Sequence, residues 1–421
     1  MAAAAVLTPA VQPDIQYAPD IEKWHQRTAK RLREENDRLQ KTLPEGFPTQ
    51  LQGSLVWEGE TVAQSYDWTY VLNEEQLAEI DDAVRHFKSL NLPLGHIDAD
   101  TFPLSKTRPE LRRLSQELHN GHGFFVIRGV DVDKHTREEN IIIYAGISSH
   151  IAAVRGRQDS SFNGNRADVV LSHIKDLTLQ LQQQQKQEDQ AGKVSIGSPA
   201  YTADKQVFHT DSGDIVSLFA LGEAAEGGAS KLASTWRVYN ELARTRPDLI
   251  HTLAADWPLE NFDKSTSERY FSRPLIYHQP ASEKQPERIL LQYARRYLVG
   301  FGALPRSPDV PPITEAQAEA LDALHFLGDR FHVATNFQKG DMQYVNNLAV
   351  FHARDGFKDT VEKQRHLVRL WLRDPENAWE TPEKLRTRWS RVYDGVTPES
   401  QVLPLEPFVR GASNGADRVK K

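Results

Sequence analysis

The second half of the chain is dominated by apolar runs that alternate as β-strands do. Successive side chains of a strand point to opposite faces, so such runs predict strands with one face on a core. Two helical patterns, at 234–253 and 314–333, interrupt them. Strands collected late in the chain, with helices before and between them, predict an α+β domain around an antiparallel barrel or sandwich. The four clearest runs are DIVSLFAL, RILLQYAR, DMQYVNNLAVFHA and RHLVRLWLRD.

The N-terminal part of the chain is largely helical in pattern. Residues 20–41 carry many charges and few apolar positions, which is typical of a surface helix that packs on a larger body. Asn73 is a suitable N-cap for a second helix. Residues 108–130 combine a helical stretch with a β-rich run that begins after Gly123.

These patterns predict one large domain with additions at both ends. We expect a helical extension at 1–75, a main domain at 76–410 and a disordered tail at 411–421. Within the main domain, residues 155–204 include the polar run QLQQQQKQEDQAGK, which predicts a surface loop. We expect this segment to form a lid over a pocket.

Composition restricts the chemistry and the setting. The chain of 421 residues contains no cysteine, so thiolate nucleophiles, disulfides and cysteine-held metals are excluded. A net charge of −7 argues against a nucleic-acid partner. The N-terminus lacks the features of a signal peptide, and no run is apolar enough to cross a membrane. We therefore expect a cytoplasmic protein that holds any metal with His and carboxylate groups.

A candidate metal pair lies in KQVFHTDSGD, just before an apolar run. If this stretch is extended, His209 and Asp211 project from the same face of a strand. A second His-x-Asp pair, His96 and Asp98, lies in a Pro/Gly-rich stretch and is better interpreted as a solvated turn. The spacing alone therefore carries little weight, and a third ligand must come from elsewhere.

His352 is the candidate for the third ligand. It lies 143 residues beyond His209 (352 − 209), at the end of the run that begins with DMQYV. If that run is one straight strand, Asn346 shares a face with His352 and is a candidate pocket residue. Two His and one carboxylate on one face of a metal are typical of non-haem Fe(II) oxygenases, which keep the remaining positions open.

The run RHLVRLWLRD adds two arginines to an apolar face. Alternation places Arg365 and Arg369 on one face with Leu367 and Trp371. Arginines on such a face are costly to bury unless each meets an anion, and Arg binds carboxylates through two parallel hydrogen bonds. The two arginines are about 13 Å apart along a strand, so each would need its own anion.

His209-Thr-Asp211, His352 and Arg365 together resemble the Fe(II)/2-oxoglutarate oxygenases of the taurine dioxygenase and clavaminate synthase group. The segment EGGASKLAS is similar to the Gly-Gly-x-Ser/Thr stretch of that group. The resemblance covers roughly 121–374, and its C-terminal part looks most like fungal members. It implies a double-stranded β-helix, or jelly-roll, core with flanking helices.

The resemblance also implies a role for each residue. His209, Asp211 and His352 would ligate Fe(II), while Arg365 and Ser230 would bind the distal carboxylate of the cosubstrate 2-oxoglutarate. The substrate would be contacted by Arg369, Asn346 and Lys205. The taurine dioxygenases carry Trp and Asn where this chain has Phe208 and Lys205, which disfavours taurine itself. Lys205 and Arg369 instead favour a carboxylate-bearing substrate.

The expected function is that of an Fe(II)- and 2-oxoglutarate-dependent oxygenase that consumes O₂ and releases succinate and CO₂. Its substrate would be a small anionic or zwitterionic metabolite, such as an amino acid or a precursor in secondary metabolism. Hydroxylation, desaturation and oxidative cyclisation are all open, and so is a homo-oligomeric state. The competing hypotheses are a metal-dependent hydrolase or isomerase and a non-catalytic metal-binding barrel, each using the same His/Asp/His site.

Overall fold

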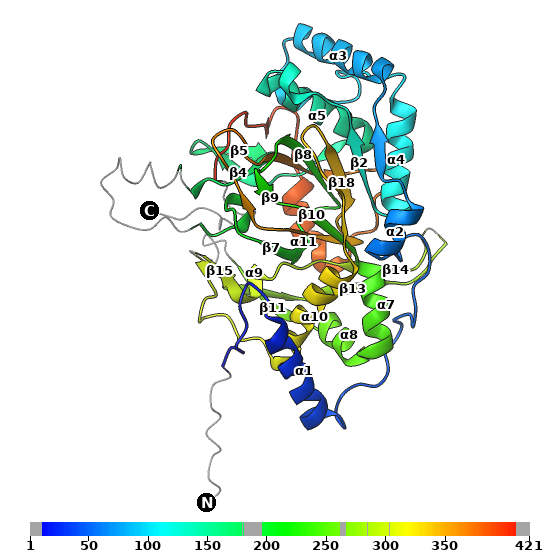
Figure 1. Ribbon diagram of the computed structural model, residues 1–421, viewed down its shortest axis with the longest axis vertical. Helices are drawn as coiled ribbons and strands as arrows, with labels where there is room; N and C mark the ends of the chain where they lie inside the picture. Colours follow the sequence, from blue (N-terminus) through cyan, green and yellow to red (C-terminus); the bar gives the residue numbers. More distant parts are fainter. Residues whose placement is uncertain are drawn as a thin grey trace, which may run out of the picture.

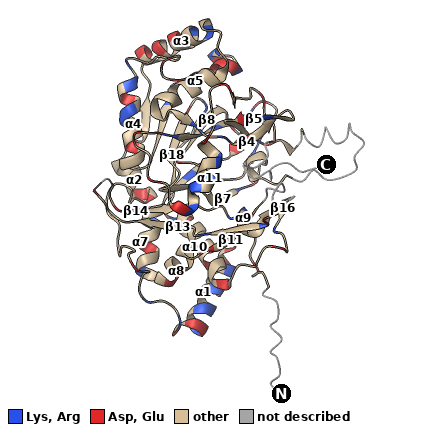
Figure 2. Ribbon diagram, turned by 180° about the vertical axis from the view of Figure 1, so that it is seen from behind, with Lys and Arg blue, Asp and Glu red and all other residues tan. Residues whose placement is uncertain are grey.

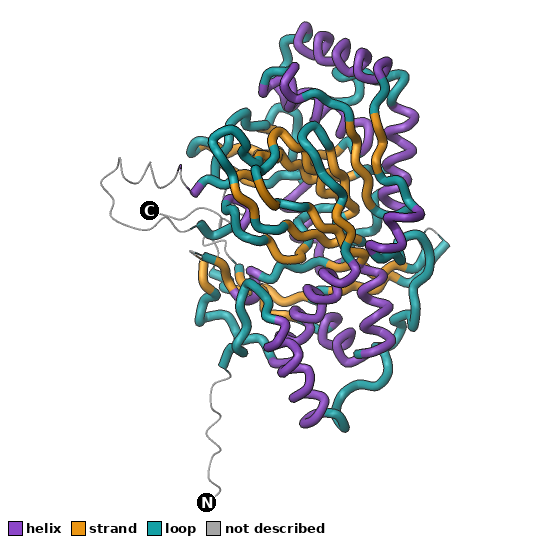
Figure 3. The backbone as a smooth tube through the Cα atoms, viewed as in Figure 1, coloured by secondary structure: helices purple, strands orange, loops and turns teal. Residues whose placement is uncertain are grey.

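A computed structural model of the protein describes residues 11–178, 180, 196–261, 267–283, 285–302 and 304–409. It confirms an α+β architecture, with strands gathered in the middle of the molecule and helices at two ends (Figures 1 and 3). The α-helices are α1 (Ile21–Glu35), α2 (Gly59–Ser65), α3 (Glu74–Ser89), α4 (Arg108–Asn120), α5 (Arg137–Ile151), α7 (Thr235–Thr245), α8 (Pro247–Ala254), α9 (Arg296–Val299), α10 (Glu315–Phe331) and α11 (Glu383–Tyr393). Short 3-10 helices are η1 (Leu94–His96), η2 (Val132–Lys134) and η3 (Pro199–Tyr201).

Two sheets form the centre, a large mixed sheet and a small antiparallel sheet. The large sheet has the order β1-β2-β18-β8-β21-β3, and β6 also pairs with β21. Its strands are β1 (Thr69–Val71), β2 (Phe124–Arg128), β3 (Val154–Arg155), β6 (Leu171–Lys175), β8 (Ile215–Gly222), β18 (Met342–Asn346) and β21 (His366–Arg373). The small sheet has the order β17-β10-β19-β7. Its strands are β7 (Gln206–His209), β10 (Ser230–Ser234), β17 (Val333–Ala334) and β19 (Val350–Arg354).

Shorter ladders surround these two sheets. They comprise β4 (Asp159–Phe162), β5 (Asn165–Val169), β9 (Glu226–Gly227), β11 (Trp257–Glu260), β12 (Tyr270–Arg273), β13 (Ile276–Gln279), β14 (Arg288–Leu291), β15 (Gly300–Phe301), β16 (Leu304–Pro305), β20 (Phe357–Lys358) and β22 (Gln401–Val402). Within the described ranges the sheets are open-edged, and none closes on itself as a barrel.

Each central sheet buries its outer face under helices. Val368, Leu370 and Leu372 of β21 pack into one core with α3, α4 and α5. The small sheet packs into a second core with α7, α8 and α10. The inner face of β21, which carries Leu367, instead turns toward a cavity shared with residues of the small sheet. The alternation of RHLVRLWLRD is therefore confirmed, and the space between the two sheets is where a site can form.

The expected N-terminal helices are present. Asp20 caps α1, and Asn73 caps α3 with a reciprocal bond to Gln76, because Asn and Asp side chains satisfy the first free amides of a helix. Acidic and basic residues are interspersed along the surface helices (Figure 2). No helix among the described residues has the length and apolar character needed to cross a bilayer.

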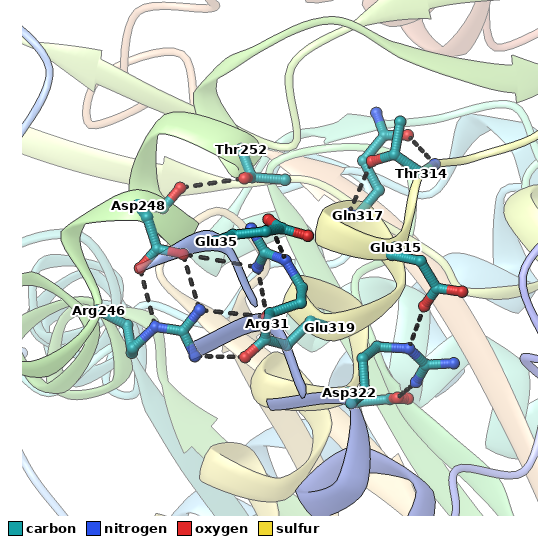
Figure 4. A network of polar contacts seen from close by, with 11 residues as sticks. Arg31, Glu35, Arg246, Asp248, Thr252, Thr314, Glu315, Gln317, Glu319 and Asp322 are labelled. Atoms are coloured by element: carbon teal, nitrogen blue, oxygen red, sulfur yellow. Dashed lines mark hydrogen bonds and ion pairs between the residues drawn. The ribbon is translucent and has the colours of Figure 1, made fainter. Parts of the chain in front are cut away.

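A buried network of ion pairs attaches α1 to the main body (Figure 4). Arg31 of α1 and Arg246, which precedes α8, both pair with Glu319 of α10. Arg246 also pairs with Asp248 at 2.7 Å. Glu319 is fully buried, so its charge depends on these two arginines. The domain boundary expected at residue 75 stays a prediction. The strand β1, which lies before that boundary, pairs with β2 in the large sheet.

The predicted lid at 155–204 does not form one unit. Its first part builds β3 to β6, and β6 is a strand of the large sheet. Residues 198–200 line a pocket. The polar run, apart from residue 180, lies outside the described residues, as does the tail predicted at 411–421. Short strands such as β3 to β6 gain their stability from tertiary pairing rather than from local propensity, and the lid role of 155–204 stays a prediction.

Candidate metal centre and its pockets

The small sheet brings the two candidate histidines together. His209 ends β7, and His352 lies in the neighbouring strand β19 as its direct antiparallel partner. Their ring centroids are 4.3 Å apart. Residues directly opposite each other in an antiparallel pair carry side chains on the same face, which is why positions so distant in sequence meet.

Asp211 completes a group of three possible ligands. One ligand atom from each of His209, Asp211 and His352 lies within 4.8 Å of the others. Asp211 Oδ2 accepts hydrogen bonds from Arg369 Nη1 at 2.8 Å and Trp371 Nε1 at 3.2 Å. Asp211 Oδ1 is turned toward His209, 3.9 Å from Nε2. The carboxylate is therefore held by one oxygen and presents the other to the histidines.

The turn that carries Asp211 is fixed by Asn347. The Asn347 Oδ1 accepts from the Asp211 amide at 2.8 Å, and its Nδ2 donates to the carbonyls of Asp211 and Gly213 at 2.8 and 2.7 Å. Asn347 is completely buried. This side chain provides the hydrogen bonds that the backbone loses where β7 ends. Because Asn347 lies in the turn between β18 and β19, that turn determines the position of Asp211.

The protonation states of the site suit a metal. Burial lowers the pKa of His209, and burial followed by the nearby His209 lowers the pKa of His352 to about 3. Both rings are therefore neutral at pH 7, as ligation requires. His209 Nδ1 lies 2.9 Å from the carbonyl of Val207, which assigns the proton to Nδ1 and leaves Nε2 as the ligand atom. Two neutral imidazoles and one carboxylate match the donor set of non-haem Fe(II).

Arg365 lies in the cavity between the two sheets. The cavity is lined by His209, Asp211, His352 and Ser230, together with Arg354, Arg365, Arg369 and apolar residues of β6, β8 and β21. Arg365 is buried, and its Nη1 has no hydrogen-bond partner among the described residues. Burial and then the neighbouring Arg354 lower the pKa of Arg365 to about 9. An unpaired guanidinium beside a metal triad is a fitting receptor for the free carboxylate of 2-oxoglutarate.

Ser230 lies at the same end of this cavity. Its Oγ donates to Gln343 Oε1 at 3.0 Å, and it is the Cα partner of Arg354 across β10 and β19. Arg354 donates to the carbonyls of Pro199 and Thr202 at 3.3 and 3.0 Å. Arg354 and Arg365 both approach the ring of Phe357, at 4.9 and 5.5 Å from its centroid. The cavity thus has a positive end at Arg365 and a metal-binding end at the triad.

A second chamber opens on the other side of the triad. Its lining includes His209, Asp211, Arg369 and Trp371, and it continues to Tyr17, Ser198, Ser212, Arg296, Tyr297 and Arg388. Tyr17 comes from the N-terminal segment, which Arg295 holds through the Gln16 carbonyl at 2.7 Å. The metal centre therefore lies between a narrow cavity and a larger chamber.

Two predicted substrate contacts lie elsewhere. Asn346 donates to the Leu118 carbonyl at 3.1 Å and accepts from the Leu348 amide, so it joins α4 to a turn. The expected straight strand ends at Asn346 and resumes at Val350 in the other sheet, and the shared face with His352 is lost. Lys205 is exposed just before β7 and lines neither pocket, because the strand begins only at Gln206. Both are corrections to the sequence-based interpretation.

Arg369 lies in the site but pairs with the candidate metal ligand Asp211 rather than standing apart as a substrate receptor. Its Nε also donates to Gln158 Oε1 at 2.9 Å. Sequence reasoning missed two residues that line the chamber, Tyr17 and Arg388, and two that support the site through hydrogen bonds, Gln158 and Asn347. Asn347 had a weak signal as the neighbour of the residue chosen, whereas the others come from segments with no motif.

Comparison with known proteins agrees with this geometry. Residues 86–371 match the family described as taurine catabolism dioxygenase TauD, TfdA family. The taurine hydroxylase-like protein SAT17 of Stachybotrys chartarum is 32% identical over 369 residues, covering 86% of this chain and 90% of that protein. FR-33289 synthase of Streptomyces rubellomurinus is 26% identical over 348 residues, covering 80% and 94%.

The fold also has a counterpart among solved structures. An asparagine oxygenase in complex with Fe(II), 2S,3S-3-hydroxyasparagine and succinate superposes with a TM-score of 0.50 at 14% identity, over 74% of this chain and 98% of that one. This likeness shows the fold, and a donor set of two His and one carboxylate is typical of mononuclear non-haem Fe(II) sites. The chain belongs to the TauD/TfdA family of Fe(II)- and 2-oxoglutarate-dependent dioxygenases. Its cofactors are Fe(II) and 2-oxoglutarate, with O₂ as cosubstrate, and the hydrolase and binding-barrel alternatives are not supported.

Proposed function

We propose that this oxygenase oxidises a small carboxylate-bearing metabolite, such as an amino acid or a precursor in secondary metabolism. The observation that carries the proposal is the charge of the chamber beyond the triad, where Arg296 and Arg388 join Arg369 in the lining. Cationic linings select anionic or zwitterionic guests and disfavour neutral apolar ones. Hydroxylation, desaturation and oxidative cyclisation are the outcomes open to such a site.

In this proposal each residue of the centre has a defined task. His209, Asp211 and His352 hold Fe(II), while Arg365 and Ser230 receive the distal carboxylate of 2-oxoglutarate. Arg369 and Trp371 orient the Asp211 carboxylate through its Oδ2. Iron and 2-oxoglutarate, when bound, supply the oxidising power from O₂ and release succinate and CO₂. The protein contributes a site sheltered from water, which prevents side reactions of the bound oxidant.

We also propose the jelly-roll interpretation of the core, with residues 1–75 as an extension of the domain at 76–410. The support is the pair of central sheets facing one cavity, with helices on their outer faces. A cytoplasmic location is likewise proposed, on the absence of cysteine. A homo-oligomeric state stays open.

The test of the proposed function begins with anaerobic addition of Fe(II) and then 2-oxoglutarate to the metal-free protein. A visible charge-transfer band that needs both components is expected. The twenty common amino acids are then screened for oxygen-dependent succinate release above the background without substrate. Absence of the band with metal bound would contradict the cofactor assignment, whereas a band without stimulation by any acid would contradict the substrate class.

Substitution of Arg365 tests the cosubstrate site directly. Arg365→Ala removes a charged, two-pronged donor, and hydrogen bonds to charged groups contribute about 1.5–3 kcal/mol. The Kd for 2-oxoglutarate, measured by anaerobic calorimetry, should therefore rise roughly 10- to 150-fold. Fe(II) binding should stay as in the wild type. Arg365→Lys keeps the charge but not the fork and should fall between, while an unchanged Kd in Arg365→Ala would assign the carboxylate to another residue.

A further inference from the structure

The chamber beyond the triad is closed in part by a helix outside the family-matched range. That range ends at residue 371, and α11 follows it at Glu383–Tyr393. Arg388 of α11 lines the chamber together with His209 and Asp211. A residue supplied by this segment can set the preference of this chain for its substrate without being part of the matched family region.

Arg388 is fixed beside the metal centre. Its Nε and Nη2 donate to Ser212 Oγ at 3.0 and 2.7 Å, and Nη2 also reaches Tyr297 Oη at 3.3 Å. The guanidinium carbon lies 5.4 Å from the centroid of the Tyr297 ring. Ser212 directly follows the candidate ligand Asp211, so the position of Arg388 is tied to that of the metal site.

Arg388 differs from its neighbours in how its charge is balanced. Arg369 pairs with Asp211, and Arg295 pairs with Asp322 at 2.7 Å. Arg388 bonds only hydroxyl groups, and no carboxylate within the described ranges forms an ion pair with it. Its Nη1 forms no hydrogen bond to the described residues. A guanidinium oriented by neutral groups, with one side still available, is suited to receive an anion.

A second arginine strengthens the positive field behind Arg388. Arg273 is buried and donates to the carbonyls of Pro274 and Gln292 at 2.9 and 2.8 Å. No ion pair to a carboxylate is formed by Arg273 in the described part of the chain. Burial lowers the pKa of Arg273, and the charge of Arg388 contributes to the shift. Arg388 and Arg273 therefore carry two positive charges that no carboxylate among the described residues balances through an ion pair.

We propose that Arg388 is the anchor for the acidic group of the substrate and thus a specificity-determining residue of this oxygenase. The proposal rests on the proposed function and moves the anion-binding role from Lys205 and Arg369 to α11. The ligand class is a small molecule with a carboxylate, because Nη1 carries two N–H donors that can each form a charge-assisted hydrogen bond to a carboxylate oxygen. Arg369 stays with Asp211, where its loss would disturb the metal centre instead.

The experiment uses the full chain loaded anaerobically with Fe(II) and 2-oxoglutarate. The probes are the common L-amino acids and simple aliphatic carboxylic acids, each compared with its uncharged carboxamide by titration calorimetry. In the wild type, at least one acid should bind more tightly than its amide. In Arg388→Gln the affinity for that acid should fall about 10- to 100-fold, because truncation of one partner of a hydrogen-bonded charge pair costs about 1.5–3 kcal/mol. The acid and the amide should then bind alike.

Matched variants separate this role from a structural one. Arg391→Gln, an exposed position one turn further along α11, should bind the acid as the wild type does. Arg388→Lys keeps the charge and should retain part of the preference for the acid over its amide. It therefore serves as the test if the Arg388→Gln variant is unstable. The affinity for 2-oxoglutarate should be the same in all of them.

Two outcomes would overturn the proposal. One is a wild type in which no acid is preferred over its amide, and the other is an Arg388→Gln variant that keeps the preference. Failure of the wild type to bind Fe(II) and 2-oxoglutarate would instead contradict the assignment of the cofactor site. The acid and amide titrations are therefore repeated on the metal-free protein. There the wild type should show the same preference for the acid, and Arg388→Gln should lose it.

Discussion

His352→Ala is expected to abolish iron binding at the centre and, with it, oxygen-dependent succinate formation. The substitution removes one of the three candidate ligands that the described residues bring together and leaves His209 and Asp211 as an incomplete pair. Loss of groups that merely support a ligand already costs about 10- to 100-fold in metal affinity, so loss of the ligand itself should exceed about 100-fold. The Kd for Fe(II) in anaerobic calorimetry, and the intensity of the band formed with 2-oxoglutarate, measure the effect.

The chain contains its own control for this experiment. His96 and Asp98 repeat the His-x-Asp spacing, but Asp98 accepts hydrogen bonds from the amides of Asp100 and Thr101 and so belongs to a turn. His96→Ala should leave the Fe(II) stoichiometry and the band unchanged. If His352→Ala bound Fe(II) with wild-type affinity while remaining folded by circular dichroism, the metal centre would have to lie elsewhere.

Glu319→Ala should produce a large loss of stability without touching the active site. Glu319 is fully buried and accepts from both Arg31 and Arg246, so its removal leaves these two arginines to share Asp248, with Glu35 as the other partner of Arg31 (Figure 4). Breaking a buried ion pair from one side costs about 3–5 kcal/mol. The free energy of unfolding, measured by urea titration, should fall by that amount.

A neighbouring residue on the same helix provides the comparison. Glu315 pairs with Arg27 at 2.8 Å but exposes 57% of its side chain, so Glu315→Ala should cost only about 0–1 kcal/mol. Equal losses in the two variants would show that burial does not determine the strength of this network. Because α1 is attached through Arg31, proteolysis within 11–35 should accelerate in Glu319→Ala and not in Glu315→Ala.

The effect of Glu319 should also depend on pH in a defined direction. Burial by itself raises the pKa of Glu319, but the hydrogen bonds and charge of Arg246, joined by Arg31, outweigh it and lower the pKa below the ordinary value of 4.5. A carboxylate with a lowered pKa in the folded state stabilises fully above its unfolded pKa and loses that contribution as the pH falls through the folded value. The difference in stability between wild type and Glu319→Ala should therefore be largest near neutral pH and shrink below about pH 4.5.

Most of the metal centre could be predicted because its residues lie in or beside strands whose alternation is visible in the sequence. The alternation of RHLVRLWLRD assigned Arg365, Leu367 and Arg369 to the pocket face, and the structure places all three there. His209 and Asp211 follow the same rule of two-residue spacing, and His352 was found at the end of a second β-like run as the histidine needed for a donor set of two His and one carboxylate. Strand periodicity depends only on backbone geometry, which is why it survives in the folded protein.

The errors arose where a strand ends, since alternation stops there. The run from Tyr344 to His352 looks continuous, but three residues of turn divide it between two sheets, and Asn347 rather than Asn346 faces the metal turn. Lys205 precedes the strand by one residue and therefore lies in solvent. Where a turn forms depends on which segments pack around it, and a single sequence does not contain that information.

By itself, the sequence determined the class of fold through strand alternation, and it singled out His209, Asp211, His352 and Arg365 through residue type, alternation and the resemblance to the family. Only the tertiary structure decided how the charges are used. It paired Arg369 with Asp211, left Nη1 of Arg365 without a partner in the described part of the chain, and brought Tyr17 and Arg388 from the two ends of the chain into one chamber. Electrostatic pairing depends on distances of a few ångströms between residues remote in sequence, and folding alone sets those distances.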